Sequence, residues 1–546
     1  MNRSFRLVII TAFAFLLVTT PSWGGGSFNT SDGQDALSNN TSGSSDSAFG
    51  WGALFADTVG NDNTAVGTNA LTSNTDGSAN TACGSQALAN TDGTTDNTAV
   101  GFQALTVNSS GTWNTATGSQ ALVANTTGLA NTATGAFSLL NNTTGNSNTA
   151  MGFAALRNNT ANGNTATGNS ALFHNTTGAG NTAGGNNALF GNIGGSDNTA
   201  TGSNALSSNT VGNGNTANGY LAMLANVTGN DNTATGNQAL LHNTGMASTG
   251  GLATGSDNTA TGSHALYTNV NGADNTASGF QALYANTSGS ANTADGFQAL
   301  LHNQNGGNNT AFGFDALFAN TTGTNNTASG LSALVSNTSG VQNSADGVQA
   351  LKNNTTGNNN IGLGYFAGYN LSTGSNNIDI GNKGVSGDAN AIKLGVQGTQ
   401  TQTFIAGISG VVIPKGVDVV VNSNGQLGVA PIVSSARFKR DIHDMGAASG
   451  PLMKLRPVTF RYKQDPQAIK QYGLVAEEVE QVYPELVTYG ADGKLETVRY
   501  QQLIPMLLNE LQRQQREIEE LKAENGKFRS ALDQIAVRMR PMLTSR

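Results

Sequence analysis

Ser434 and Lys439, five residues apart, are the pair in this 546-residue chain whose types and spacing suggest covalent chemistry. A serine hydroxyl is a weak nucleophile until a neutral amine takes its proton. A lysine amine is neutral near pH 7 only if burial or a neighbouring cation lowers its pKa, and Arg437 and Arg440 flank Lys439. Taken alone, this spacing more often joins a turn-capping serine to a surface lysine. The sequence shows no His/Asp arrangement for a conventional hydrolase triad.

The distribution of charge divides the chain into two parts. Of its 25 Lys and Arg residues, 18 lie from Arg437 onward, so the first four-fifths carries almost no positive charge. The net charge of −8 argues against a nucleic-acid partner, which would require a basic face. The single cysteine, Cys83, excludes an intrachain disulfide. We expect no cofactor and no metal, because the histidines that share one repeat position lie on non-adjacent repeats: His174, His242 and His302.

Residues 1–24 have the pattern of a secretory signal peptide. Arg3 and Arg6 precede the apolar run Leu7–Val18, and small residues lead to a cleavage site after Gly24. The apolar run is short for a membrane span, although an uncleaved anchor is the alternative. No later stretch could cross a bilayer as a helix. We therefore expect a secreted or cell-surface protein with no integral membrane segment after signal cleavage.

Residues 25–382 repeat one nearly uncharged unit, Asn-Thr-Ala-x-Gly-x-x-Ala-Leu, with a period of 17 residues. The period is broken by one step of 16 and one of 26 residues, the longer one inserting residues around Met246–Leu252. Such regularity is typical of a stacked solenoid. Glycines at the fifth position and in the Asn-Thr-Thr-Gly tract permit turns with positive φ. The first asparagine can form a hydrogen-bonded ladder, and the alanines and leucine supply a thin apolar seam. We predict a mainly β fold, a parallel β-solenoid or β-roll.

A stack of near-identical units raises a problem of alignment between chains. Three chains side by side would bury the thin apolar seam more fully than one, which favours a homotrimer. Slipping one chain by one repeat would change few contacts, so misaligned trimers would be close in energy. Such a fibre needs a separate element that sets its register.

A β-rich stem is expected at residues 383–433, with short strands at Ile392–Gly395, Thr403–Gly407, Val411–Ile413 and Val417–Val421. Residues 503–546 have the heptad pattern of a coiled-coil helix, with Pro505 in its first turn. Gln514 and Asn525 interrupt the apolar seam, as residues that fix register often do. A single helix packed on its own domain is the alternative. The predicted coiled-coil core is Ile504, Leu507, Leu511, Ile518, Leu521, Phe528 and Leu532.

Two resemblances bear on these segments. The repeats resemble those of trimeric autotransporter adhesin heads and, more closely, phage tail fibres, whose array ends are similar to Asn360–Gly368 and Asn376–Gly381. Residues 434–502 resemble the intramolecular chaperone domain at the C-terminus of phage endosialidases and tail spikes, which begins Ser-Asp-x-Arg-Leu-Lys-x-x-Ile. This chain matches that start except that Ser435 replaces Asp and Phe438 replaces Leu. Four further blocks match in order: Leu452–Lys463, Tyr472–Val479, Tyr483–Val487 and Val498–Tyr500.

The second resemblance implies that Ser434 is a nucleophile and Lys439 its base, cutting the chain's own backbone between Val433 and Ser434. It also implies a small α+β chaperone domain at residues 434–502. The expected function is that of an exported trimeric fibre, displayed toward a cell-surface glycan or another surface receptor, whose chaperone domain aligns three chains and then cuts itself off. One alternative is a polysaccharide-degrading enzyme of the tail-spike type. Another is a chaperone domain that stays attached as a trimeric cap.

Overall fold

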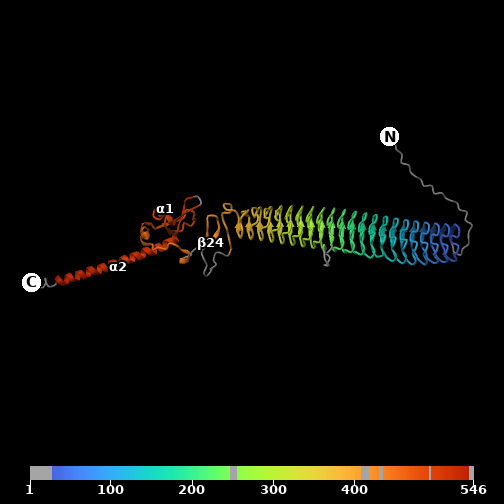
Figure 1. The fold of residues 1–546 in the computed structure, drawn as a ribbon, viewed down its shortest axis with the longest axis horizontal. Coiled ribbons are helices and arrows are strands. Elements are labelled where there is room, and N and C mark those ends of the chain that lie inside the picture. Colours follow the sequence, from blue (N-terminus) through green and yellow to red (C-terminus); the bar gives the residue numbers. More distant parts are fainter. Residues whose placement is uncertain (1–27, 246–254, 407–418, 430–434, 491–492, 540–546) are drawn as a thin grey trace, which may run out of the picture. The chain divides into compact units, whose positions relative to one another are not determined.

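The computed structural model describes residues 28–245, 255–406, 419–429, 435–490 and 493–539. The predicted signal peptide, residues 1–24, lies outside these ranges, as do Val433 and Ser434. The chain divides into two units, one ending at Thr399 and the other beginning at Gln400, and each is described by itself (Figure 1).

The first unit is a parallel β-solenoid of about 21 turns, as predicted (Figure 1). Each turn contributes one strand of three residues. The strand is short because residues with positive φ lie on both sides of it, as Asp197 (φ 58°) and Gly202 (φ 130°) do around Thr199–Thr201. The strands are β1 (Thr30–Asp32), β2 (Ser47–Phe49), β3 (Thr64–Val66), β4 (Thr81–Cys83), β5 (Thr98–Val100), β6 (Thr115–Thr117), β7 (Thr132–Thr134), β8 (Thr149–Met151), β9 (Thr165–Thr167), β10 (Thr182–Gly184), β11 (Thr199–Thr201), β12 (Thr216–Asn218), β13 (Thr233–Thr235), β14 (Thr259–Thr261), β15 (Thr276–Ser278), β16 (Thr293–Asp295), β17 (Thr310–Phe312), β18 (Thr327–Ser329), β19 (Ser344–Asp346), β20 (Ile361–Leu363), β21 (Ile378–Ile380) and β22 (Ile392–Leu394).

Every strand pairs in parallel with the strand of the next turn, and the same repeat positions face each other. Ala183 lies opposite Ala200, for example, and Ala200 lies opposite Ala217. The step of 26 residues does not interrupt this ladder, because Thr233 in β13 pairs directly with Thr259 in β14. Register within one chain is therefore uniform from end to end.

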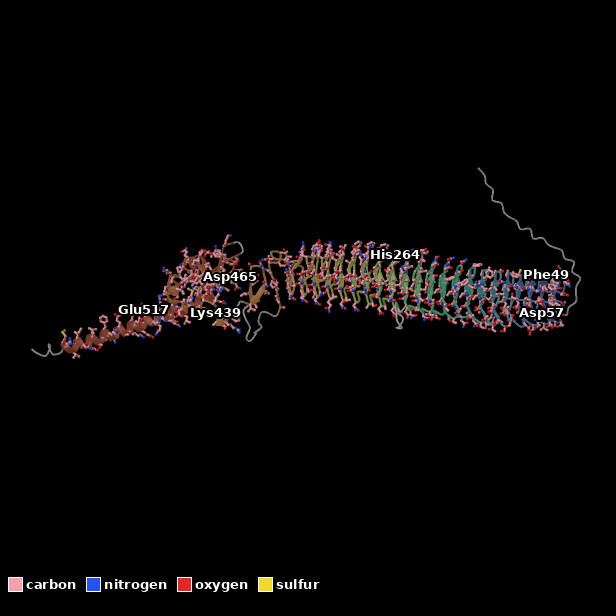
Figure 2. The ribbon with its side chains drawn as sticks, viewed as in Figure 1. Phe49, Asp57, His264, Lys439, Asp465 and Glu517 are labelled. Atoms are coloured by element: carbon pink, nitrogen blue, oxygen red, sulfur yellow. The ribbon has the colours of Figure 1, made fainter. Side chains whose placement is uncertain are left out.

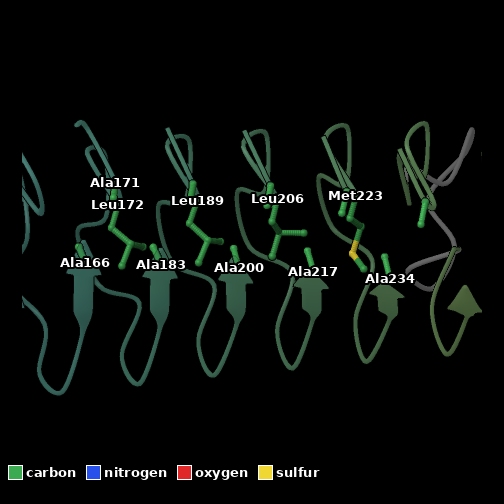
Figure 3. Packing of buried hydrophobic residues seen from close by; sticks show 14 of the residues in the cluster. Ala166, Ala171, Leu172, Ala183, Leu189, Ala200, Leu206, Ala217, Met223 and Ala234 are labelled. Carbon is green, nitrogen blue, oxygen red and sulfur yellow. The ribbon is translucent and has the colours of Figure 1, made fainter. Parts of the chain in front are cut away.

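The predicted apolar seam is confirmed as the core. The alanine in the middle of the strands from β2 to β19 and the Ala-Leu pair of most turns are fully buried, as Ala200, Ala205 and Leu206 show. Figure 3 shows these side chains stacked from turn to turn, with Met223 in the place of one leucine. The expectation that three chains would bury this seam more fully than one is wrong, because its alanines and leucines are already fully buried in the single chain. The turns fold over the seam closely enough that a single chain already excludes water from it.

Two buried asparagine ladders run beside the core. In the predicted one, Asn198 donates its backbone N–H to Asn181 Oδ1 (3.0 Å) and its side-chain Nδ2 to the same oxygen (3.1 Å). The second ladder, at the twelfth repeat position, was not predicted, and in it Asn209 Nδ2 donates to Asn192 Oδ1 (2.7 Å). Asn198 and Asn209 also both donate to the carbonyl of Gly212 (2.9 Å each). These bonds satisfy polar groups that would otherwise be costly to bury.

The glycines have two different roles. Gly202, at the fifth position, has φ of +130°, as predicted, and an added Cβ would lie 2.5 Å from the carbonyl oxygen of Gly219. Gly212, in the second glycine tract, is absent from the positive-φ positions, so the prediction for that tract is wrong. It is needed for space, because a Cβ there would lie 2.4 Å from the next carbonyl oxygen. Leu206 adopts φ of 53°, so a left-handed residue is also the core residue of its turn.

The ladder continues through β22, which lies within the segment predicted as a stem. Of the other predicted strands, residues 403–406 contain no strand and Val411–Ile413 lies outside the described residues. The second unit begins with an antiparallel hairpin of β23 (Val419–Val421) and β24 (Leu427–Val429). Its turn is closed by a hydrogen bond from Gly425 N–H to the Asn422 carbonyl (2.9 Å).

The remainder of the second unit is a small mixed domain followed by one long helix. It contains the short helices η1 (Ala436–Phe438), η2 (Gly446–Lys454), α1 (Ala476–Glu480) and η3 (Pro484–Leu486), the strands β25 (Val458–Phe460), β26 (Gln471–Gly473), β27 (Val487–Tyr489) and β28 (Leu495–Val498), and the helix α2 (Tyr500–Met539).

Pro505 is the sixth residue of α2, so its predicted place in the first helical turn is wrong. Among the described residues, no helix combines the length and apolar character that a membrane crossing requires.

Candidate self-cleavage and assembly site

The described part of the predicted dyad is Lys439, directly after η1. Its backbone N–H donates to the Ala436 carbonyl (3.0 Å), which closes the short helix and fixes the direction of the chain. The side chains of Ser435 to Arg440 are exposed, and Figure 2 marks Lys439 among them. Ser434 and Val433 lie outside the described residues, so the Ser434–Lys439 pairing and the cleavage site stay predictions.

Two cations next to Lys439 have other partners. The Arg437 guanidinium lies over the Phe438 ring, 4.5 Å from its centroid. Arg440 pairs with Asp441 at 3.9 Å, and both side chains are almost fully exposed. Water and salt weaken the effect of such exposed charges on their neighbours.

The sequence blocks that follow the dyad converge on one core. Val458–Phe460 pairs with Gln471–Gly473 as β25 and β26, which joins the first two blocks. Tyr500, from the last block, accepts a hydrogen bond at its hydroxyl from Leu474 N–H (2.9 Å). The buried core residues of this domain are Leu452, Val479, Tyr483, Leu486, Val487, Val498, Leu503 and Met506. The blocks therefore belong to one small mixed domain, of the kind that the family resemblance implied.

A buried polar cluster attaches the long helix to this domain. Ser449 in η2 donates its hydroxyl to Glu510 Oε2 (3.2 Å), and Asn509 Nδ2 donates to Ser449 Oγ (2.7 Å). Arg513 neutralises the Glu510 carboxylate at 3.0 Å. Tyr483 donates its hydroxyl to the Ala448 carbonyl (2.9 Å), and burial raises the pKa of that phenol. Sequence reasoning missed this cluster, since isolated Ser and Glu residues about 60 positions apart carry no motif.

The predicted coiled-coil positions form an uncovered apolar stripe along α2. The helix buries Leu503, Met506 and Glu510 against its own domain. The stripe lies on another side of the helix, and its side chains are between 45 and 67% exposed: Ile504, Leu507, Leu511, Ile518, Leu521, Phe528 and Leu532. Figure 2 shows α2 with side chains standing out along its length, where Glu517 is labelled. The alternative of a helix packed on its own domain thus applies only to its first part, and the coiled coil itself stays a prediction.

Comparison with known proteins gives one match. Residues 434–488 match the family model described as "Chaperone of endosialidase". This peptidase family is known for self-cleavage, and membership in it implies a homotrimer. Comparison with curated proteins and with solved structures gives no match. The matched residues contain η1, η2, β25, β26, α1 and most of the domain core. The chain therefore carries a C-terminal endosialidase chaperone domain after a long β-solenoid.

Proposed function

We propose that this chain is an exported fibre protein, similar to tail fibres and adhesins, that assembles as a homotrimer. In this proposal residues 1–24 direct export, and the solenoid is displayed toward a cell-surface glycan or another surface receptor. The endosialidase chaperone domain gathers three chains, aligns them and releases itself by cleavage between Val433 and Ser434.

The observation that carries the proposal is the position of the family match, which begins at Ser434, the predicted nucleophile. A match to a self-cleaving family that starts at this serine supports a cut at the seam between the fibre and its chaperone. Lys439 follows within the same match and is the candidate base.

The uniform ladder explains why such a chaperone would be needed. Neighbouring turns repeat the same backbone, because every strand pairs with its neighbour through the same three repeat positions. Chains offset by one turn would therefore lose little contact. In α2, by contrast, Gln514 and Asn525 give single positions of the stripe a distinct chemistry, so that only one alignment pairs like with like.

Cleavage would depend on assembly. Lys439 is exposed in the single chain, whereas a lysine that acts as a general base needs a buried or cationic environment. Neighbouring chains would supply that environment once three domains meet. Removing the chaperone afterwards would make assembly effectively irreversible, because the released part could no longer catalyse separation of the chains.

The test compares two adjacent serines. We expect purified wild-type protein to lack residues 434–546, Ser434→Ala to stay whole, and the matched control Ser435→Ala to be cut as wild type is. Lys439→Arg should also stay whole, since a guanidinium remains protonated and cannot act as the base. Intact-mass spectrometry of the wild type and the three variants shows whether each has lost residues 434–546.

If wild type and every variant run whole but trimeric, the self-cleavage proposal fails and the attached trimeric cap takes its place. If Ser435→Ala alone blocks the cut, the nucleophile is Ser435.

A further inference from the structure

Part of the solenoid surface carries a continuous row of large apolar side chains. They occupy the sixth repeat position on the six consecutive turns from β15 to β20, and they are between 40 and 69% exposed: Phe280, Phe297, Phe314, Leu331, Val348 and Tyr365. On the six preceding turns the same position is polar except for one tyrosine: Asn169, Asn186, Ser203, Tyr220, Asn237 and Ser263. We call the first set the apolar row.

The backbone holds the apolar row straight. The carbonyls of the first five row residues each accept a hydrogen bond from the next turn, as in Gln298 N–H to Phe280 (3.0 Å) and Asp315 N–H to Phe297 (3.0 Å). The rings of Phe280 and Phe297 stack with centroids 5.3 Å apart, and those of Phe297 and Phe314 with centroids 4.9 Å apart. The row therefore has a fixed spacing along the solenoid axis.

The apolar surface widens toward the last turns of the ladder. At the fourth repeat position, on the other side of the fifth-position glycine, four further apolar side chains are exposed: Phe312, Leu363, Ile380 and Leu394. Aromatic side chains bury about 150–250 Å² each when fully covered, and four of the six row residues are aromatic, so the exposed part of the row alone offers roughly 500 Å² per chain. Together the two sets approach the ~800 Å² per partner of a stable interface.

We propose that the apolar row is where copies of this chain pack against one another, and that turns β9–β14 remain in water. This inference rests on the homotrimer of the proposed function. Identical rows on parallel, aligned chains place apolar side chains opposite apolar side chains, which a three-fold arrangement allows. The row also lies in the part of the ladder nearest in sequence to the chaperone domain, so chains aligned by that domain would meet first at this surface.

The geometry of the rings favours a second copy over a glycan. Sugars stack on the open faces of aromatic rings. The planes of Phe297 and Phe314 are only 7° apart and each covers a face of the other, so they present mainly edges to solvent. Ring edges pack well against the apolar side chains of another row.

Disulfide crosslinking of the full-length chain tests the inference. In a Cys83→Ser background, Phe297→Cys places one thiol on the row and the matched control Ser203→Cys places one at the same repeat position in the polar turns. Disulfides require Cβ atoms about 3.5–4.5 Å apart. Facing thiols inside a complex have a far higher effective concentration than free chains, so we expect at least about tenfold more disulfide-linked dimer from Phe297→Cys.

Equal crosslinking of the two variants would overturn the inference, because the chains would then pack along their whole length. No crosslinking in a chain that light scattering shows to be trimeric would overturn it and leave the proposed function intact. A monomeric chain would overturn both. Leu331→Cys, on the same row, repeats the measurement if Phe297→Cys does not fold.

Discussion

Leucine has opposite surroundings in the two units of this protein. In the solenoid, the leucine of almost every turn is fully buried by its own chain, as Leu189 and Leu206 show. In α2, Leu511 and Leu532 are more than half exposed, although they recur just as regularly. The solenoid thus completes its core without a partner. The long helix α2 is covered by its own chain only along its first turns, where it packs against η2.

In the proposed fibre, this difference assigns two tasks to two parts of the chain: the solenoid forms a stable rod, and the long helix sets the alignment between chains. The solenoid supplies a rod whose turns stabilise each other, but their uniformity leaves the alignment between chains unspecified. The helix is not stabilised by its own chain over most of its length, and its stripe has distinct positions. In the proposed trimer, the partner chains would therefore supply alignment to the first unit and stability to the second.

The largest expected effect comes from a charge placed in the stripe of α2. In a Ser434→Ala background, which should keep α2 attached, Leu511→Glu should convert the trimer to monomers, because three carboxylates would meet in the interior of the coiled coil. The adjacent residue provides the control, since Gln512→Glu adds the same charge outside the stripe and should leave the trimer intact. Size-exclusion chromatography with light scattering gives the mass of each. Trimeric Leu511→Glu would show that α2 is not the element that joins the chains.

A smaller effect is expected in the solenoid core. Leu206→Ala should lower the free energy of unfolding of the surrounding turns by about 2–5 kcal/mol, because the closed seam cannot collapse around the cavity. Leu206→Met should cost less than about 1.5 kcal/mol, since Met223 already fills the same place. Hydrogen exchange in urea measures both.

Substitution of the exposed Leu532 sharpens the comparison. In the same Ser434→Ala background, Leu532→Ala should leave hydrogen exchange of the solenoid unchanged and weaken only the association of chains. An equal loss of solenoid protection in Leu532→Ala and Leu206→Ala would contradict the independence of the two units.

The repeat made the solenoid predictable, because a fixed period places the same residue types at the same depth on every turn. The buried Ala200 and Leu206 and the ladder of Asn181 and Asn198 followed directly from it. The second ladder was equally visible as a recurring asparagine, and a search for every repeated polar position would have found it.

Other features carry no local signal. Leucine is disfavoured in the left-handed region, and only the tight closure of the turn explains φ of 53° at Leu206. That closure also removed the reason for expecting other chains to cover the seam. In the second unit, the bond between Ser449 and Glu510 depends on how η2 meets α2, which composition and spacing do not determine.

The smallest expected effect concerns a carboxylate at the first turns of the ladder. Asp57 occupies a position that is asparagine on most other turns, and it is fully buried. Asn40 Nδ2 donates to its Oδ2 (2.7 Å) and Asn74 Nδ2 to its Oδ1 (3.1 Å). Burial, helped by the charge of nearby Asp46, raises the pKa of Asp57 to about 6. The first turns are thus the one part of the described solenoid where the second ladder contains a buried acid.

The sign of the resulting pH dependence follows from the raised pKa. Folding favours the protonated acid, so its contribution is fully present below the unfolded pKa near 3.8 and is lost as pH rises through about 6. Asp57→Asn removes that loss and should stabilise the first turns at pH 8 by no more than about 3 kcal/mol, with little change at pH 4. The fluorescence of Trp51 during urea unfolding reports on these turns once Trp23 and Trp113 are replaced by phenylalanine.

The hydrogen bonds around Asp57 also predict that Asp57→Asn stabilises the first turns. Elsewhere in this ladder the amide of each turn donates backward, as Asn209 does to Asn192. Asp57 has no amide to donate, and Asn40 Oδ1 is buried without a partner among the described residues. An asparagine at position 57 would donate to that oxygen once the Asn40 amide turns over, and its own oxygen would still accept from Asn74. Asp96→Asn, at an exposed aspartate, is the matched control and should change stability little at either pH. An equal gain from both substitutions would show that net charge, and not the buried acid, limits these turns.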